Sequence, residues 1–148
     1  MDITERLDAM EAAIRKPSFR QSSGKANEVN YWIFDYPPEK ELEVRERIEY
    51  MKHKNSKGMD EFELAVFDLY DIIIDFLEGK NFIEKCCDFE KKRGIQKIVK
   101  AVSNSMKVSE DDNLIVRYIL DHTPENAIVF LTGVGKSYPL LRSHNVLN

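Results

Sequence analysis

The sequence predicts a single α/β domain in which helices flank a mostly parallel sheet, a Rossmann-like three-layer arrangement. Short apolar or aromatic runs at residues 30–36, 62–68 and 127–131 have the length and composition of strands. Segments with helical spacing separate these runs, and strands joined through helices pair in parallel with right-handed crossovers. We expect one domain over residues 1–148, with an N-terminal helix over residues 1–16 and an α/β core over residues 28–148.

The first third of the chain predicts a helix, a strand and a second helix. Asp2 followed by Glu5 has the pattern of a capping box, which predicts that a helix begins there, and Pro17 ends it. The aromatic run at residues 30–36 is the expected first strand, stopped by two prolines. A charged helix follows over about residues 39–54.

That charged helix contains two pairs of opposite charge at the spacing that joins neighbouring turns. Glu41 precedes Arg45 by four positions, and Glu43 precedes Arg47 by four positions. The order with glutamate first is the favourable one, so we expect both pairs to stabilise the helix surface.

The middle of the chain predicts a strand and then several short helices. Apolar and polar residues alternate over residues 62–68, which is typical of a half-buried strand. A helix is expected from Tyr70 to Gly79, another over residues 81–93, and a third after Gly94. Ser109 with Asp112 predicts the cap of a last short helix.

The C-terminal stretch predicts a strand, a glycine turn and the start of a helix. Residues 127–131 are all apolar, which is typical of a strand buried on both faces. Gly133 and Gly135 form the turn, and Pro139 is well placed at the first position of a helix. Since three strands are few for such a sheet, we expect the natural chain to continue past Asn148 with at least one more strand.

The composition limits the function classes. The chain has 148 residues, of which 43% are hydrophobic and 32% charged, as in a soluble globular protein. Its net charge of −4 argues against extensive contact with phosphate backbones but leaves a local basic patch open. The sequence has neither a membrane span nor a signal peptide, so we expect a cytoplasmic protein. Adjacent cysteines and scattered histidines indicate neither a metal site nor a cofactor.

The segment TGVGKS at residues 132–137 resembles the end of a Walker A loop. A phosphate-binding loop needs a further glycine where this chain has Phe130, and its lysine and serine must open a helix that Tyr138 and Pro139 delay. We therefore favour a glycine turn that lets the chain double back on its strand. A nucleotide site remains the alternative.

Polar residues follow the predicted strands at their carboxyl ends. In a parallel sheet, Asp35, Asp68 and the turn at residues 132–137 lie at one rim, where two carboxylates and Lys136 could hold a metal–phosphate ligand. An acidic residue between a strand and a helix is more commonly a helix cap, and we favour that interpretation. Arg142 and His144 follow the turn. Arg142 could bind a phosphate or a carboxylate ligand, or could be a buried arginine that pairs with Asp35 or Asp68, and His144 could carry a proton.

A basic region lies later in the chain. Its members are Lys91, Lys92, Arg93, Lys97, Lys100 and Lys107. Such a region can contact nucleic acid, but nearby acidic residues dilute it, and a solvated helix face is the favoured interpretation.

Three segments resemble the BrxB family of bacterial BREX phage-defence systems: NEVNYWIFDYPPE at residues 27–39, LAVFDLY at residues 64–70, and LTGVGKSYPLLRSH at residues 131–144. The resemblance implies an accessory or assembly factor without an established catalytic motif. It also implies that other BREX proteins are the partners, with the phosphatase-like protein PglZ as the favoured one.

The sequence therefore predicts a non-enzymatic interaction module without a cofactor. The alternative is a degenerate nucleotide- or nucleic-acid-binding domain that uses the rim of the sheet, and a hydrolase would need a metal between Asp35 and Asp68. The candidate ligand- or partner-binding residues are Asp35, Tyr36, Asp68, Tyr70, Gly133, Gly135, Lys136, Pro139, Arg142 and His144.

Overall fold

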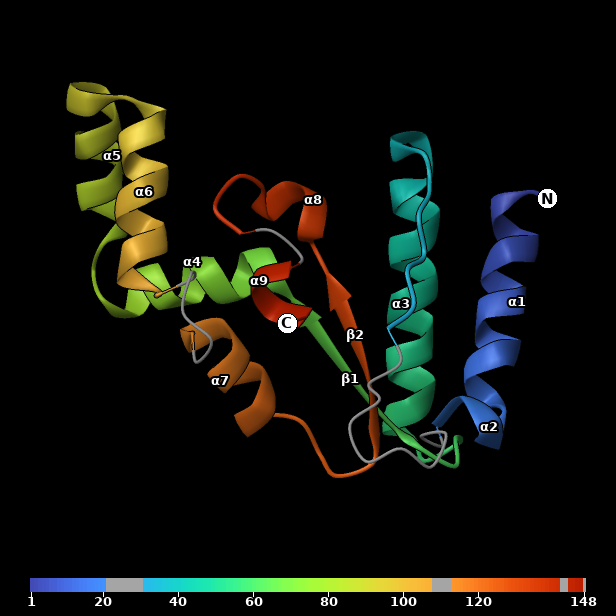
Figure 1. The fold of residues 1–148 in the computed structure, drawn as a ribbon. Helices are drawn as coiled ribbons and strands as arrows, with labels where there is room; N and C mark the ends of the chain where they lie inside the picture. The colour runs from blue at the N-terminus through green and yellow to red at the C-terminus, as the bar shows by residue number, and fades with distance from the viewer. Residues whose placement is uncertain (21–30, 108–112, 142–143, 148) are drawn as a thin grey trace. The chain divides into compact units, whose positions relative to one another are not determined.

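The computed structural model describes residues 1–20, 31–107, 113–141 and 144–147 (Figure 1). The chain divides into two compact units. Unit 1 comprises Met1–Ala65 with Pro124–Ile128, and unit 2 comprises Val66–Thr123 with Val129–Asn148. The single domain expected from the sequence stays a prediction.

Unit 1 begins with the helix that the sequence predicts. Helix α1 (Ile3–Arg15) starts at a capping box, in which the backbone N–H of Glu5 donates to Asp2 Oδ1 at 2.8 Å and the N–H of Asp2 donates to Glu5 Oε2 at 3.0 Å. This prediction is confirmed. The further helices of unit 1 are α2 (Pro17–Arg20), the 3₁₀ turn η1 (Pro38–Lys40) and α3 (Glu41–Ser56).

The predicted first strand is wrong over its described part. Residues 31–37 form neither a helix nor a strand. Phe34 and Tyr36 instead pack against a core of Ile3, Leu7 and Val44, from α1 and α3. Side chains do alternate over residues 33–36, because Ile33 and Asp35 are exposed whereas Phe34 and Tyr36 are partly buried. The alternation arises from an extended segment that lies on helices without a strand beside it.

The sheet is smaller than predicted. Within the described residues, β1 (Glu63–Asp68) pairs in parallel with β2 (Ala127–Thr132), and these two strands form the sheet. Both strands lie where the sequence predicts them, whereas a Rossmann-like three-layer sheet is not confirmed. The strand over residues 127–131 is not buried on both faces, because the side chain of Val129 is 37% exposed.

The described part of unit 2 holds helices α4 to α9, and α4 to α7 follow the order that the sequence predicts. Their bounds are α4 (Leu69–Gly79), α5 (Ile83–Arg93), α6 (Ile95–Ser105), α7 (Leu114–Asp121), α8 (Val134–Ser137) and α9 (His144–Leu147). Helix α4 packs against α5, α7 and α8, and α5 packs against α6 across Gly94, whose φ is +85°. The helix α7 is capped by Asn113, whose Oδ1 accepts from the N–H of Val116 at 2.8 Å. The cap predicted at Ser109 and Asp112 lies outside the described residues.

The helix expected at Pro139 begins earlier. The one-turn helix α8 starts directly after Gly133, and Pro139 lies in the turn that follows this helix, after a cis Tyr138–Pro139 peptide bond. Gly133 has a φ of +71°, a left-handed conformation that only glycine adopts readily. This conformation redirects the chain at the end of β2, so that the helical turn forms before the proline.

Candidate functional site

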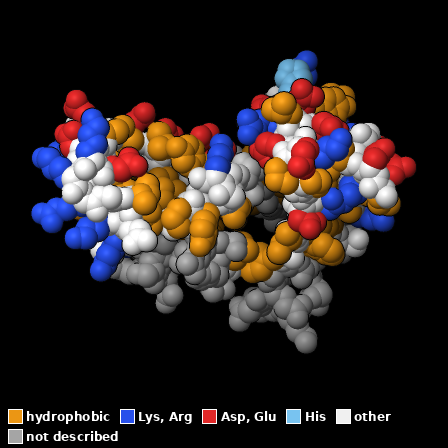
Figure 2. All heavy atoms as spheres, turned by 90° about the horizontal axis from the view of Figure 1, so that it is seen from above, with side chains coloured by type: hydrophobic (Ala, Val, Ile, Leu, Met, Phe, Trp, Pro, Cys, Tyr) orange, Lys and Arg blue, Asp and Glu red, His pale blue; other side chains and the backbone are white. Residues whose placement is uncertain are grey.

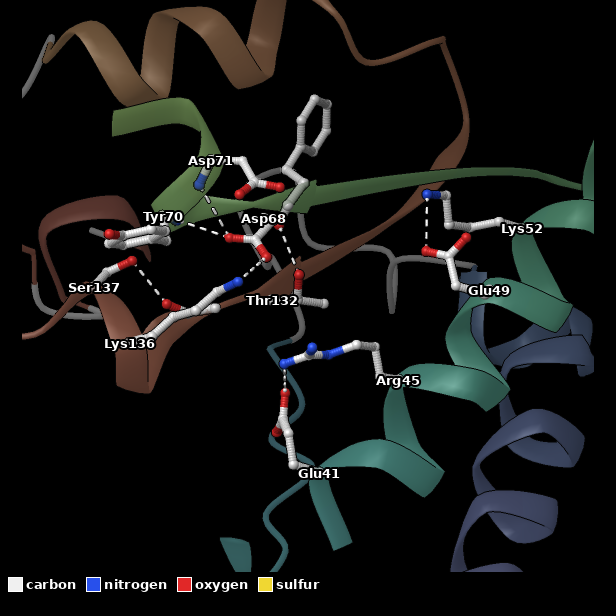
Figure 3. Close-up of polar contacts among 12 residues, drawn as sticks. Glu41, Arg45, Glu49, Lys52, Asp68, Tyr70, Asp71, Thr132, Lys136 and Ser137 are labelled. Atoms are coloured by element: carbon white, nitrogen blue, oxygen red, sulfur yellow. Dashed lines mark hydrogen bonds and ion pairs between the residues drawn. The ribbon is translucent and has the colours of Figure 1, made fainter. Parts of the chain in front are cut away.

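Asp68 lies at the carboxyl end of β1 and caps the next helix. Its Oδ1 accepts from the backbone N–H of Tyr70 at 2.9 Å and from that of Asp71 at 3.1 Å, which satisfies two of the free donors at the start of α4 (Figure 3). The favoured prediction for this residue, a helix cap, is confirmed.

The second oxygen of Asp68 binds the lysine of the glycine turn. Lys136 Nζ lies 2.8 Å from Asp68 Oδ2, with 44% and 24% of the two side chains exposed. The same ammonium lies 5.4 Å from the centre of the Tyr70 ring, within cation–π range. Three residues that the sequence marks as candidates therefore lie together, and the cation that resembles a Walker lysine is held by a carboxylate of its own chain (Figure 3).

Gly133 makes this arrangement possible. A Cβ atom at position 133 would meet the Asp68 carboxylate and the Lys136 side chain, and the residue also has a positive φ. Gly135 differs, because a Cβ atom there has nothing within 4 Å. Gly133 is thus required both because the Asp68 carboxylate lies against it and because of its left-handed backbone. Neither reason applies to Gly135.

Hydrogen bonds from two hydroxyl groups stabilise the turn at residues 132–137. Ser137, which is buried, donates from Oγ to the carbonyl oxygen of Gly133 at 2.7 Å and so closes α8. Thr132 donates from Oγ1 to the carbonyl oxygen of Phe67 at 3.4 Å, between the ends of β2 and β1. Figure 3 shows both side chains beside the Asp68–Lys136 pair. The turn is therefore tied to β1 and to α4 at several points.

The electrostatics of Asp68 favour its ionised form. Burial, the largest influence, opposes ionisation and raises the pKa of the carboxyl group. The hydrogen bond and charge of Lys136, together with the backbone donors of Tyr70 and Asp71, outweigh burial and hold the pKa below its usual value. The carboxylate is thus suited to a fixed structural charge, whereas a general acid at neutral pH would need a raised pKa.

The other acidic candidate belongs to unit 1 and has its own partner. Asp35 Oδ1 lies 3.0 Å from Nη2 of Arg6, and the aspartate does not end a strand. Next to it, the hydroxyl of Tyr36 donates to Glu41 Oε2 at 2.7 Å. Burial, followed by this hydrogen bond and the negative charge of Glu41, raises the pKa of Tyr36 to about 12.

The remaining candidates are placed only in part. Pro139 is exposed in the turn after α8. Arg142 lies outside the described residues, and His144 is the first residue of α9, although its side chain is not described. The predicted pairing of Arg142 with Asp35 or Asp68 stays a prediction.

Sequence reasoning missed a polar cluster in unit 1. The Asp60 side chain is 7% exposed and lies 3.8 Å from Arg15 and 3.9 Å from Lys54. Asn55 Nδ2 donates to Asp60 Oδ2 at 3.0 Å and to the carbonyl oxygen of Phe62 at 2.7 Å. Nothing in the local sequence signals this cluster, because its members come from two helices and a loop. It joins the end of α3 to the start of β1.

The described residues contain neither a cluster of metal ligands nor a helix able to span a membrane. Among them, no three histidine, cysteine, aspartate or glutamate side chains gather as a group able to hold a metal ion. In the same part of the chain, no helix combines the length and the apolar character that a membrane crossing needs.

The structure thus defines a small mixed α/β protein, whose strand-end turn is closed by an internal ion pair. Residues 65–148 match the family described as "BREX protein BrxB". A "BREX protein BrxB" from Bacillus cereus is 41% identical over 146 residues, covering 99% of this chain and 76% of the relative. One from Escherichia coli is 29% identical over 143 residues, covering 97% of this chain and 69% of the relative.

The chain belongs to the BrxB family of BREX proteins. The resemblance expected from three sequence segments is therefore confirmed. No solved structure matches the chain.

Proposed function

We propose that this chain is a non-enzymatic assembly component of a BREX phage-defence complex and acts through protein–protein contacts. The observation that carries the proposal is the exposed apolar segment before η1. Trp32 is 72% exposed and Ile33 is 89% exposed. Large exposed apolar side chains are costly in water, and tryptophan is among the residues that contribute most to binding at protein interfaces.

The segment is held in place beneath these two side chains. The ring of Trp32 stacks on Phe19 with centroids 5.5 Å apart, and Phe34 packs on the core of α1 and α3. A segment fixed in this way loses little conformational entropy when a partner binds, which favours affinity. A partner that covers Trp32 and Ile33 would bury apolar surface that this chain leaves in water.

The arrangement at Asp68 supports a structural role for the strand-end turn. Its lysine is paired with Asp68, and the carboxylate is also occupied by the backbone donors of α4. A phosphate ligand would have to compete with this pair for Lys136. The family membership supports another BREX protein as the partner, and the resemblance of the sequence favours PglZ.

The test is a tagged pull-down from cells that carry a complete BREX operon, with nuclease treatment of the lysate. We compare the natural sequence with the double variant Trp32→Ala, Ile33→Ser. Leu120→Ala is the matched control, because Leu120 is 69% exposed and lies in unit 2. Circular dichroism and thermal unfolding establish that each variant is folded.

We expect the natural sequence and Leu120→Ala to recover the same BREX protein, identified by mass spectrometry. The double variant should recover at least about tenfold less, since interface residues of this kind each contribute more than about 1–2 kcal/mol. Equal recovery by the double variant, or no BREX protein recovered with the natural sequence, would contradict the proposal.

A further inference from the structure

Positive charge is concentrated from the end of α5 to just past the end of α6, although α5 also holds the acidic residues Glu84, Asp88 and Glu90. We call the set of cations there the basic hairpin surface; it consists of Lys91, Lys92, Arg93, Lys97, Lys100 and Lys107. All six residues are exposed. Figure 2 shows Lys and Arg side chains gathered along one edge of the molecule, over α5 and α6. This surface stands out because the whole chain has a net charge of −4.

Among the described residues these cations have no carboxylate partner, in contrast to most cations of unit 1. In unit 1, by contrast, Arg6 pairs with Asp35, Arg47 with Asp8 and Glu11, and Lys52 with Glu49. The charges of unit 1 are therefore largely neutralised within the fold, whereas those of the basic hairpin surface are available to an external anion.

Helix α6 presents its lysines on one side. Lys97, Lys100 and Asn104 recur at the spacing of a single helix face and are exposed, while Ile98 and Val102 on the opposite side are buried. No acidic residue occurs in α6. From residue 97 to residue 104 the helix rises about 10 Å, which is the rise of about three base pairs of B-form DNA.

Helix stability accounts for only part of this pattern. Lys91, Lys92 and Arg93 lie in the last turn of α5, where positive charge is favourable to the helix dipole. Lys97 lies in the first turn of α6, where positive charge is unfavourable, and that turn has no acidic residue. A cation at this position therefore costs some folding stability, which points to a role in binding.

We propose that the basic hairpin surface binds the backbone phosphates of a nucleic-acid duplex, without reading its sequence. Lysines are point charges suited to phosphate oxygens, and they are depleted in protein–protein interfaces, so a nucleic acid fits better than an acidic protein. Helix α6 has no aromatic residue, and Phe89 of α5, at 38% exposed, is one ring where a single strand needs several rings for successive bases, so a duplex is the expected form. This inference does not depend on the proposed assembly role.

The test uses the complete chain and a fluorescently labelled random-sequence DNA duplex of about 30 base pairs, with binding followed by anisotropy between about 25 and 200 mM NaCl. The variant is Lys97→Gln, Lys100→Gln, Lys107→Gln. The control is Lys16→Gln, Lys52→Gln, Lys57→Gln, which removes the same charge from exposed lysines of unit 1. Unlabelled duplex, unlabelled single-stranded DNA and vesicles with anionic lipid serve as competitors.

We expect the natural sequence and the control to bind the duplex with the same salt dependence. In the variant, the slope of log K against log salt should fall by about 2–3, because each phosphate contact contributes about 0.9, and affinity at the lowest salt should drop at least about tenfold. The Trp32→Ala, Ile33→Ser protein should bind the duplex like the natural sequence, which separates this inference from the assembly role.

Three results would overturn the proposal. The first is no duplex binding by the natural sequence at the lowest salt. The second is an equal loss in the variant and in the control, which would mean that net charge alone governs binding. The third is stronger competition by single-stranded DNA or by vesicles than by unlabelled duplex.

Discussion

The ammonium of Lys136 lies 2.8 Å from Oδ2 of Asp68, and the other oxygen of the same carboxylate caps α4. One side chain therefore links the end of β1, the start of α4 and the glycine turn after β2. Because Gly133 leaves room for this carboxylate, the turn and the cap depend on each other. The first three predictions follow from this relationship.

Gly133→Ala should lower the free energy of unfolding by about 1–3 kcal/mol, because a left-handed alanine is strained and its Cβ would displace the Asp68 carboxylate. Gly135→Ala is the matched control, two residues away in α8, with open space around the added atom. It should change stability by less than about 1 kcal/mol, in the stabilising direction if at all. Urea unfolding followed by circular dichroism measures both, and equal effects would contradict the structure.

Asp68→Asn keeps a good helix cap but removes the negative charge, and Lys136→Met removes the positive charge. Each should cost about 0.5–1 kcal/mol, since the pair is partly exposed and solvent screens it. The double variant should cost less than the sum, as expected for residues in contact. Asp68→Ala should cost about 1–2 kcal/mol more than Asp68→Asn, because it also removes the cap. Strict additivity in the double-mutant cycle would show that the pair contributes nothing.

The stability that Asp68 provides should depend on pH in a defined direction. Its pKa is lower in the folded protein than its ordinary value of 3.8, so folding favours the ionised form. The contribution is fully present above pH 3.8 and is lost as the pH falls through the lower pKa of the folded state. The stability difference between the natural sequence and Asp68→Asn should thus be constant near neutral pH and shrink as the pH falls below 3.8. A difference that grows on acidification would refute this assignment.

Tyr36 should ionise later than an ordinary tyrosine. Its pKa is raised from 10.0 to about 12, first by burial and then by its hydrogen bond to Glu41. The protonated form is therefore stabilising below pH 10, and this contribution is lost as the pH rises towards 12. Ultraviolet titration of tyrosinate should lose its latest component in Tyr36→Phe, whereas Tyr138→Phe, at an exposed tyrosine, should leave that component in place. Loss of an early component in Tyr36→Phe would contradict the structure.

Local sequence patterns were sufficient for much of the chain. The capping box at Asp2 and Glu5, the strand at residues 62–68 and the helices on either side of Gly94 lie where the sequence predicts them. The capping box and the helices depend on residues a few positions apart, whose propensities and hydrogen bonds recur in any fold, and the strand is indicated by its local alternation of apolar and polar residues. The family was likewise recognisable from three short segments, and the comparisons confirm it.

Contacts between distant segments decided the rest. Glu41 pairs with Arg45 as its spacing predicts, whereas Arg47 leaves Glu43 and binds Asp8 and Glu11 on α1. The aromatic run at residues 30–36 predicts a strand, yet Phe34 and Tyr36 pack on helices, because strand propensity favours an extended backbone without specifying what it packs against. Lys136 resembles a phosphate ligand in sequence, and only the fold brings the Asp68 carboxylate to it across more than sixty residues. Sequence alone thus determined most of the elements and the family, while tertiary structure decided which of the described charges are paired and what the segment at residues 31–36 packs against.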